Sequence, residues 1–176
     1  TFDDFQPNDN VCGCEVGRTH DQLQGWYGDL DKVEIKTKGG LNEHLDLDKG
    51  VNTHFVEVEN ATLINKGYND QNHYCAMRFE ENENYDFSVW LKGTGNLKVT
   101  LKDEHDASIS ESVVITNDSD VWQQHTSLVL KSNKTTLGQM TFEIEGKLSI
   151  DNFSMMPQNV WGNEKENISK TANMNY

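Results

Sequence analysis

Residues 85–92 read Tyr-Asp-Phe-Ser-Val-Trp-Leu-Lys, an alternation of apolar and polar side chains with one exception. Successive side chains of a β-strand point to opposite faces, so this pattern predicts a strand with one buried and one wet face. The apolar set is Tyr85, Phe87, Val89 and Leu91. The exception is Trp90, which falls on the polar side with Asp86, Ser88 and Lys92.

Eight further segments alternate in the same way, and clusters of Gly, Asn and Asp separate them. With residues 85–91, the predicted strands are 33–37, 54–59, 74–79, 96–101, 110–115, 123–130, 140–145 and 147–155. The pair Gly93-Thr-Gly95 predicts a hairpin turn between two of them. No segment before residue 160 has a convincing helical period. We therefore expect an all-β fold, a two-sheet antiparallel β-sandwich of the jelly-roll type with a short C-terminal tail of helical character.

Length and charge limit the possible functions. The 176 residues fit one domain, with a lead-in at 1–10, the sandwich at 11–158 and a tail at 159–176. A formal charge of −14 repels nucleic acid, anionic membranes and polyuronides, whereas a neutral glycan meets no such penalty. No apolar run approaches the roughly 20 residues that span a bilayer. Cys12, Cys14 and Cys75 are too few for a disulfide framework, and we expect free thiols.

Several segments together resemble a known family. They are Gly25-Trp26, 53–58, 65–68, 84–92, 97–101 with Asp103, 121–128, and 148–157 with Trp161. In combination they resemble the carbohydrate-binding jelly rolls of families 4, 9 and 22, and more narrowly the module that accompanies family 51 α-L-arabinofuranosidases.

This resemblance implies a non-catalytic, secreted carbohydrate-binding module. It would target a linked glycoside hydrolase to a neutral plant cell-wall polysaccharide such as xylan, arabinoxylan or β-glucan. The tail would then lead toward a catalytic domain that this chain lacks, so the chain alone is not expected to be an enzyme. The partners would be the polysaccharide and that catalytic domain. A structural spacer in the same glycosidase is the alternative.

Sugar recognition combines rings that stack on C–H faces with polar groups that bracket hydroxyls. The candidate rings are Trp90, Trp26, Tyr27, Tyr68 and Tyr74. The candidate polar groups are Ser88, Lys92, Arg78, Glu143 and Glu145. Each ring can instead pack on the sandwich, and the two cations can instead pair with the abundant acids.

Glu143 and Glu145 also raise a catalytic alternative. Carboxylates two residues apart on one strand face lie roughly 6–7 Å apart. Glycosidases use similar separations, so a stand-alone jelly-roll glycosidase is a third hypothesis. The acidic and aromatic motif of family 16-type β-glucanases is absent around these residues.

Calcium is the expected cofactor, because it takes six to eight oxygen ligands and such modules often use it to pin strand ends. The resemblance implies Asp151 in the last strand and Glu15 near the first as its ligands. Around Glu15 the sequence departs from the family, since Cys14 stands where such modules often have Phe.

Overall fold

The structure is a computed structural model, and it describes residues 26–48, 52–67 and 77–159. Its strands are β1 (Trp26–Gly28), β2 (Val33–Lys36), β3 (Phe55–Asn65), β4 (Met77–Phe79), β5 (Asn84–Asp103), β6 (Val113–Lys131) and β7 (Thr136–Pro157). The other elements are a 3-10 turn, η1 (Leu30–Lys32), and a short helix, α1 (Leu41–His44). Within these ranges no helix is long and apolar enough to span a membrane. The three cysteines, the predicted lead-in and residues 160–176 of the predicted tail lie outside them.

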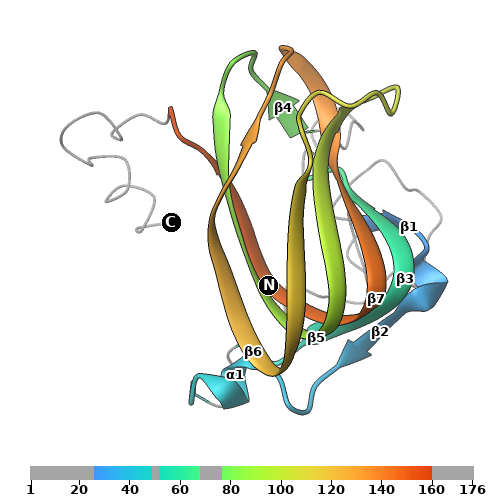
Figure 1. Cartoon of the computed structure of the whole chain (residues 1–176), viewed down its shortest axis with the longest axis vertical. Helices are drawn as coiled ribbons and strands as arrows, with labels where there is room; N and C mark the ends of the chain where they lie inside the picture. The colour runs from blue at the N-terminus through green and yellow to red at the C-terminus, as the bar shows by residue number, and fades with distance from the viewer. Residues whose placement is uncertain (1–25, 49–51, 68–76, 160–176) are drawn as a thin grey trace.

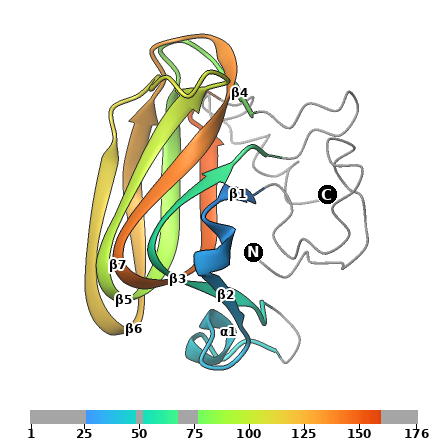
Figure 2. The same cartoon turned by 90° about the vertical axis from the view of Figure 1, so that its right-hand side faces the viewer.

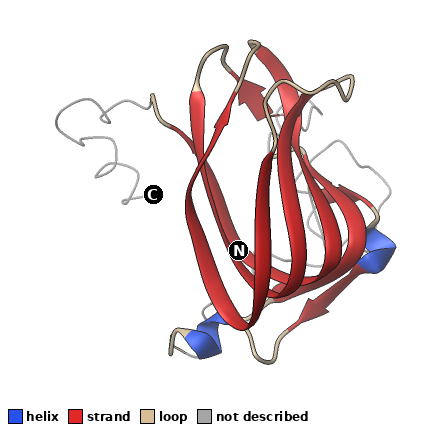
Figure 3. Ribbon diagram, viewed as in Figure 1, coloured by secondary structure: helices blue, strands red, loops and turns tan. Residues whose placement is uncertain are grey.

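All described strands belong to one antiparallel sheet, so the all-β prediction is confirmed (Figure 3). The main path runs β1-β3-β7-β5-β6, while β2 also pairs with β3 and β4 with β7. The three long strands curve so that their two halves lie opposite each other (Figures 1 and 2). The two layers of the sandwich are therefore two halves of one folded sheet.

The strand boundaries differ from the prediction. Segments 85–91 and 96–101 form the single strand β5, and β6 and β7 each join two predicted strands in the same way. Gly93-Thr-Gly95 is therefore not a hairpin turn, since it lies inside β5. One signal was available. Leu91 and Leu97 are both buried at positions of the same parity, so the alternation continues through the two glycines.

A line of irregular positions crosses the sheet where it folds. Gly93 and Gly146 have positive φ of 108° and 86°, and Gly95 pairs with Gly146 across β5 and β7. On β3, a bulge lies at Asn60, whose Oδ1 accepts a hydrogen bond from the Gly146 amide at 2.8 Å. A Cβ on Gly93 would lie 2.4 Å from the carbonyl oxygen of Lys147. Glycine is required here because the strands bend and approach closely.

The main core fills the space between the two halves. Phe142, on the first half of β7, is fully buried. Its ring centroid lies 5.4 Å from Trp26, 5.9 Å from Phe87 and 5.6 Å from Phe153, all edge-on. Phe87 and Phe153 come from the opposite half of the sheet. The apolar side chains of the alternating strands therefore close the fold by packing against each other across the two layers.

Substitution of Gly93 tests the bend. Gly93→Ala is expected to lower the free energy of unfolding by about 2 kcal/mol or more, since alanine is strained at this φ and its Cβ meets backbone. Urea unfolding followed by tryptophan fluorescence measures the change. The neighbouring exposed Thr94→Ser serves as the control and should stay within about 0.5 kcal/mol. Equal stabilities for the two variants would contradict the close approach.

A polar chain joins β6 to the bend. His125 Nε2 lies 2.9 Å from Oδ1 of the buried Asn117, whose Nδ2 donates to the Gly93 carbonyl at 2.7 Å. Because Asn117 uses its amide N–H toward Gly93, its oxygen faces His125, and Nε2 of the imidazole is the donor.

Burial lowers the pKa of His125. A lowered pKa favours the neutral ring in the folded state, so protonation favours the unfolded chain. The folded state is expected to keep its full stability above the ordinary histidine pKa of 6.5 and to lose part of it as the pH falls below that value. Thermal unfolding between pH 8 and pH 5 measures this loss. His125→Gln keeps an N–H donor without the titration, so its profile should be flatter; an identical profile would exclude His125 as the cause.

Candidate functional site

The predicted site residues fall on opposite outer faces of the folded sheet. On β5, the alternation holds: Ser88, Trp90 and Lys92 point away from the main core, as predicted. Glu143 and Glu145 lie on the half of β7 that pairs with the other half of β5. We call these two surfaces the Trp90 face and the Glu143 face. No single site can therefore use all the predicted residues.

Trp90 is partly buried on its face. It packs against a small outer cluster of Leu41, Phe55 and Trp122, separate from the main core. The exposed ring of His44 on α1 meets it edge-on, with centroids 6.0 Å apart and planes at 67°. The indole therefore has one side against protein and keeps a part accessible to solvent.

Polar side chains surround Trp90 on neighbouring strands. Its cross-strand partners are the exposed Gln124 on β6 and the buried Asp151 on β7. Ser88 lies two residues away on β5 and is partly exposed. Gln124 and His44 were not predicted from the sequence as neighbours of this ring. For Gln124 a signal existed, because it shares the parity of Trp122, whereas no local pattern places His44 there.

Lys92 is engaged with protein groups. Its Nζ donates to the Gly39 carbonyl at 2.9 Å and lies 5.3 Å and 5.2 Å from the rings of Phe55 and Trp122. Trp122 Nε1 donates to the same Gly39 carbonyl at 3.0 Å. The donor that the sequence predicts for a sugar hydroxyl therefore fastens the segment before α1 to the sheet.

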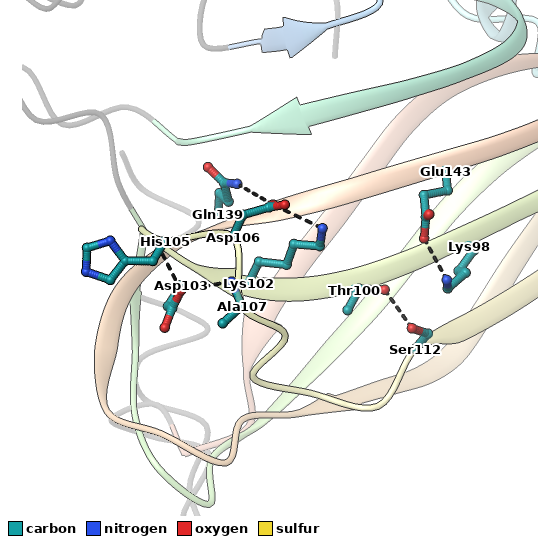
Figure 4. Close-up of polar contacts among 10 residues, drawn as sticks. All are labelled: Lys98, Thr100, Lys102, Asp103, His105, Asp106, Ala107, Ser112, Gln139 and Glu143. Atoms are coloured by element: carbon teal, nitrogen blue, oxygen red, sulfur yellow. Dashed lines mark hydrogen bonds and ion pairs between the residues drawn. The ribbon is translucent and has the colours of Figure 1, made fainter.

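The Glu143 face is polar and paired within itself (Figure 4). Glu143 forms an ion pair with Lys98 at 2.7 Å, and both side chains are more than two-fifths exposed. Further along, Asp106 accepts from Lys102 at 3.0 Å and from Gln139 at 3.4 Å.

Glu145, opposite Asn96 on β5, is also exposed. Neither Glu143 nor Glu145 is enclosed. Glycosidase carboxylates act in a water-excluded environment, so this exposure does not favour a catalytic role for the pair.

The two aromatic residues of β1 lie in different environments. Trp26 is only 7% exposed and packs edge-on against Phe142 and Phe153, so it packs on the sandwich, which was the alternative to sugar stacking. Tyr27 lies in register with Ile64 on β3, and Nζ of Lys66 sits 4.4 Å from its ring centroid. Trp26 is thus buried in the core, and the ammonium group of Lys66 lies over the ring of Tyr27.

Arg78 lines a cavity of about 740 Å³ near β4. The lining residues are Met77, Arg78, Phe79, Glu80, Glu81, Glu83, Tyr85, Met140, Phe153, Met155, Pro157 and Asn159. The lining combines apolar side chains with three glutamates. Nε of Arg78 donates to Glu80 at 2.7 Å, so the guanidinium is already paired at the surface. Tyr68 and Tyr74 lie outside the described residues.

Asp151, the expected calcium ligand, is fully buried. It accepts hydrogen bonds from Asn52 Nδ2 at 2.8 Å and from the Asn152 amide at 2.6 Å. Asn52 Oδ1 is buried and has no hydrogen-bond partner among the described residues. Glu15 lies outside them, and within them no group of three or more His, Cys, Asp or Glu side chains could hold a metal ion. Asp151 and Asn52 therefore supply two oxygen-bearing side chains, which is only part of the six to eight oxygen ligands that calcium takes.

The chain is similar in sequence and in structure to parts of two arabinofuranosidases. No protein-family model matches. Over 156 residues, 87% of this chain, it is 22% identical to an extracellular exo-α-L-arabinofuranosidase of Streptomyces chartreusis, of which it spans 17%. The structure superposes on 24% of an arabinose-bound family 51 α-L-arabinofuranosidase, MgGH51, with a TM-score of 0.56 and 12% identity over 79% of this chain. The resemblance inferred from the sequence is confirmed.

A bacteriophage CBA120 protein shares the fold too. The enzymatically active domain of its tailspike protein 4 superposes with a TM-score of 0.54 and 12% identity, over 88% of this chain and 22% of that one. At such low identity these likenesses establish the fold alone. This chain spans no more than a quarter of any of these three proteins.

Proposed function

We propose that this chain is a non-catalytic carbohydrate-binding module that holds a linked α-L-arabinofuranosidase on a neutral plant cell-wall polysaccharide outside the cell. Xylan or arabinoxylan is the first choice, and mixed-linkage β-glucan is the next. The observation that carries the proposal is the partly exposed indole of Trp90, set among polar side chains on an outer sheet face. Binding of the module to the polysaccharide would raise the local concentration of the linked enzyme at its substrate.

The charge and the relatives support this choice. A net charge of −14 disfavours anionic ligands and leaves neutral glycans as acceptable partners. The chain is similar to a minor part of a named extracellular arabinofuranosidase, as expected for an accessory module beside a larger catalytic part. The accessible carboxylates of the Glu143 face do not favour catalysis by this chain alone.

A structural spacer is the second candidate. The contacts of Trp90 with the outer cluster and with His44 favour it, because they serve stability without a ligand. The two functions differ in a simple measurement, since only a binding module is retarded by glycan.

Affinity gel electrophoresis across a glycan panel tests the proposal. Retardation by xylan, arabinoxylan or β-glucan, with a dissociation constant in the micromolar range or weaker, is expected. Polygalacturonate serves as the anionic control and should cause none. No retardation by any neutral glycan would favour the spacer, and release of reducing sugar would favour a glycosidase.

Calcium at Asp151 is a separate proposal, supported by the burial of this carboxylate and by the oxygen of Asn52, which has no hydrogen-bond partner within the described part of the chain. Adding EDTA is expected to lower the melting temperature by several degrees, and excess CaCl₂ should restore it. Asp151→Asn should abolish the response to EDTA. A melting temperature that is the same with calcium and with chelator would exclude the site.

A further inference from the structure

The outer cluster on the Trp90 face lies beneath α1. Trp122 and Phe55 are each 3% exposed, and Leu41 of α1 is fully buried against them. α1 lies beside β6 at the bent end of the sheet (Figure 1). The two aromatic rings belong to a cluster separate from the main core, and Leu41 of the segment that carries α1 covers them together with Trp90 and Lys92. We call residues 39–47 the cover segment.

Few interactions fasten the cover segment to the sheet. Lys92 Nζ and Trp122 Nε1 both donate to a single acceptor, the Gly39 carbonyl. Its one buried apolar side chain is Leu41, whereas Leu45 and Leu47 are each 41% exposed. A helix of four residues is also too short to persist without its tertiary contacts.

The closed arrangement also leaves a polar atom unsatisfied. Asn42 Oδ1, on the cover segment, is buried and has no hydrogen-bond partner among the described residues. A buried acceptor without a donor destabilises the arrangement that buries it. Lifting the segment would return this oxygen to water, and its hydration would offset part of the free energy that opening requires.

The surface under the cover segment has the composition of a saccharide platform. Trp122 lies two residues along β6 from Gln124, the cross-strand partner of Trp90, so the two indoles share one face on neighbouring strands. Lys92 follows Trp90 by two residues on β5, with its Nζ 5.2 Å from the Trp122 ring, and it would become a free donor once the Gly39 carbonyl leaves. Rings beside a cation and amides suit the C–H faces and hydroxyls of neutral sugars.

We propose that the cover segment is a movable lid and that a neutral polysaccharide displaces it, extending the binding surface from Trp90 to Trp122 and Lys92. This inference rests on the proposed function at the Trp90 face. The polysaccharide binds the open form, and the apparent affinity is reduced by the fraction of molecules that are closed. Weakening the closed form should therefore strengthen binding.

Titration with xylohexaose and arabinoxylan, by calorimetry, tests this with two matched variants. Leu41→Ala removes the buried anchor and is expected to bind about three- to tenfold more tightly than the wild type. Leu45→Ala removes an exposed leucine of the same segment and should bind like the wild type. Leu41→Val, a smaller truncation of the same anchor, replaces Leu41→Ala if that variant does not fold, and it should also bind more tightly than the wild type.

Hydrogen exchange of the wild type gives an independent readout. The amides of His44 and Leu45 are bonded within α1, and xylohexaose should accelerate their exchange if it lifts the segment. Unchanged or slower exchange with bound glycan, or weaker binding by Leu41→Ala, overturns the lid while leaving the proposed function intact. Failure of every variant to bind any neutral glycan overturns the proposed function and the lid with it.

Discussion

Phe142→Ala is expected to lower the free energy of unfolding by about 3–5 kcal/mol. The ring is fully buried and touches Trp26, Phe87 and Phe153, so its removal leaves a cavity between the two halves of the sheet. The two layers cannot collapse freely onto this cavity because β5 and β7 are continuous through the bend. The loss should therefore lie in the upper part of the range known for large-to-small core substitutions.

Equilibrium unfolding in urea, followed by tryptophan fluorescence, measures this effect. Val121→Ala, at an exposed outer position of β6, is the control and should change stability by less than about 0.5 kcal/mol. A loss below about 1 kcal/mol for Phe142→Ala would show that the halves do not pack as described.

Trp90→Ala is expected to weaken binding to the retained polysaccharide by at least about tenfold. An aromatic side chain that stacks on a sugar buries apolar area worth roughly 1.5–3 kcal/mol, and about 1.4 kcal/mol corresponds to a factor of ten. Calorimetric titration with a soluble oligosaccharide of that polysaccharide measures the change. Because Trp90 also packs against the outer cluster, circular dichroism must show that the variant remains folded.

Glu143→Gln provides the matched control on the opposite outer face. It removes a charge from an exposed ion pair with Lys98 and should leave the affinity unchanged. If Trp90→Ala binds like the wild type while Glu143→Gln binds weakly, the glycan occupies the Glu143 face.

The predicted site was less accurate than the predicted fold. Alternation placed Ser88, Trp90 and Lys92 on the outer face correctly, because side-chain direction along a strand is a local property. It could not show that Nζ of Lys92 would be bonded to Gly39, since that contact joins segments distant in the chain. Trp26 was named as a candidate sugar-stacking ring for the same reason, since its burial depends on contacts with β3 and β7.

The amino-acid pattern alone therefore established an all-β fold in which each strand has one apolar and one polar face, and the net charge of −14 alone disfavoured polyanionic ligands. Tertiary structure decided that Gly93 and Gly95 bend a strand rather than end it, because their role depends on Gly146 of a different strand. It also decided that α1 covers Trp122 and part of Trp90. The periodicity of the sequence predicts which way each side chain points. The distant residue that each side chain contacts is determined only by the folding of the whole sheet.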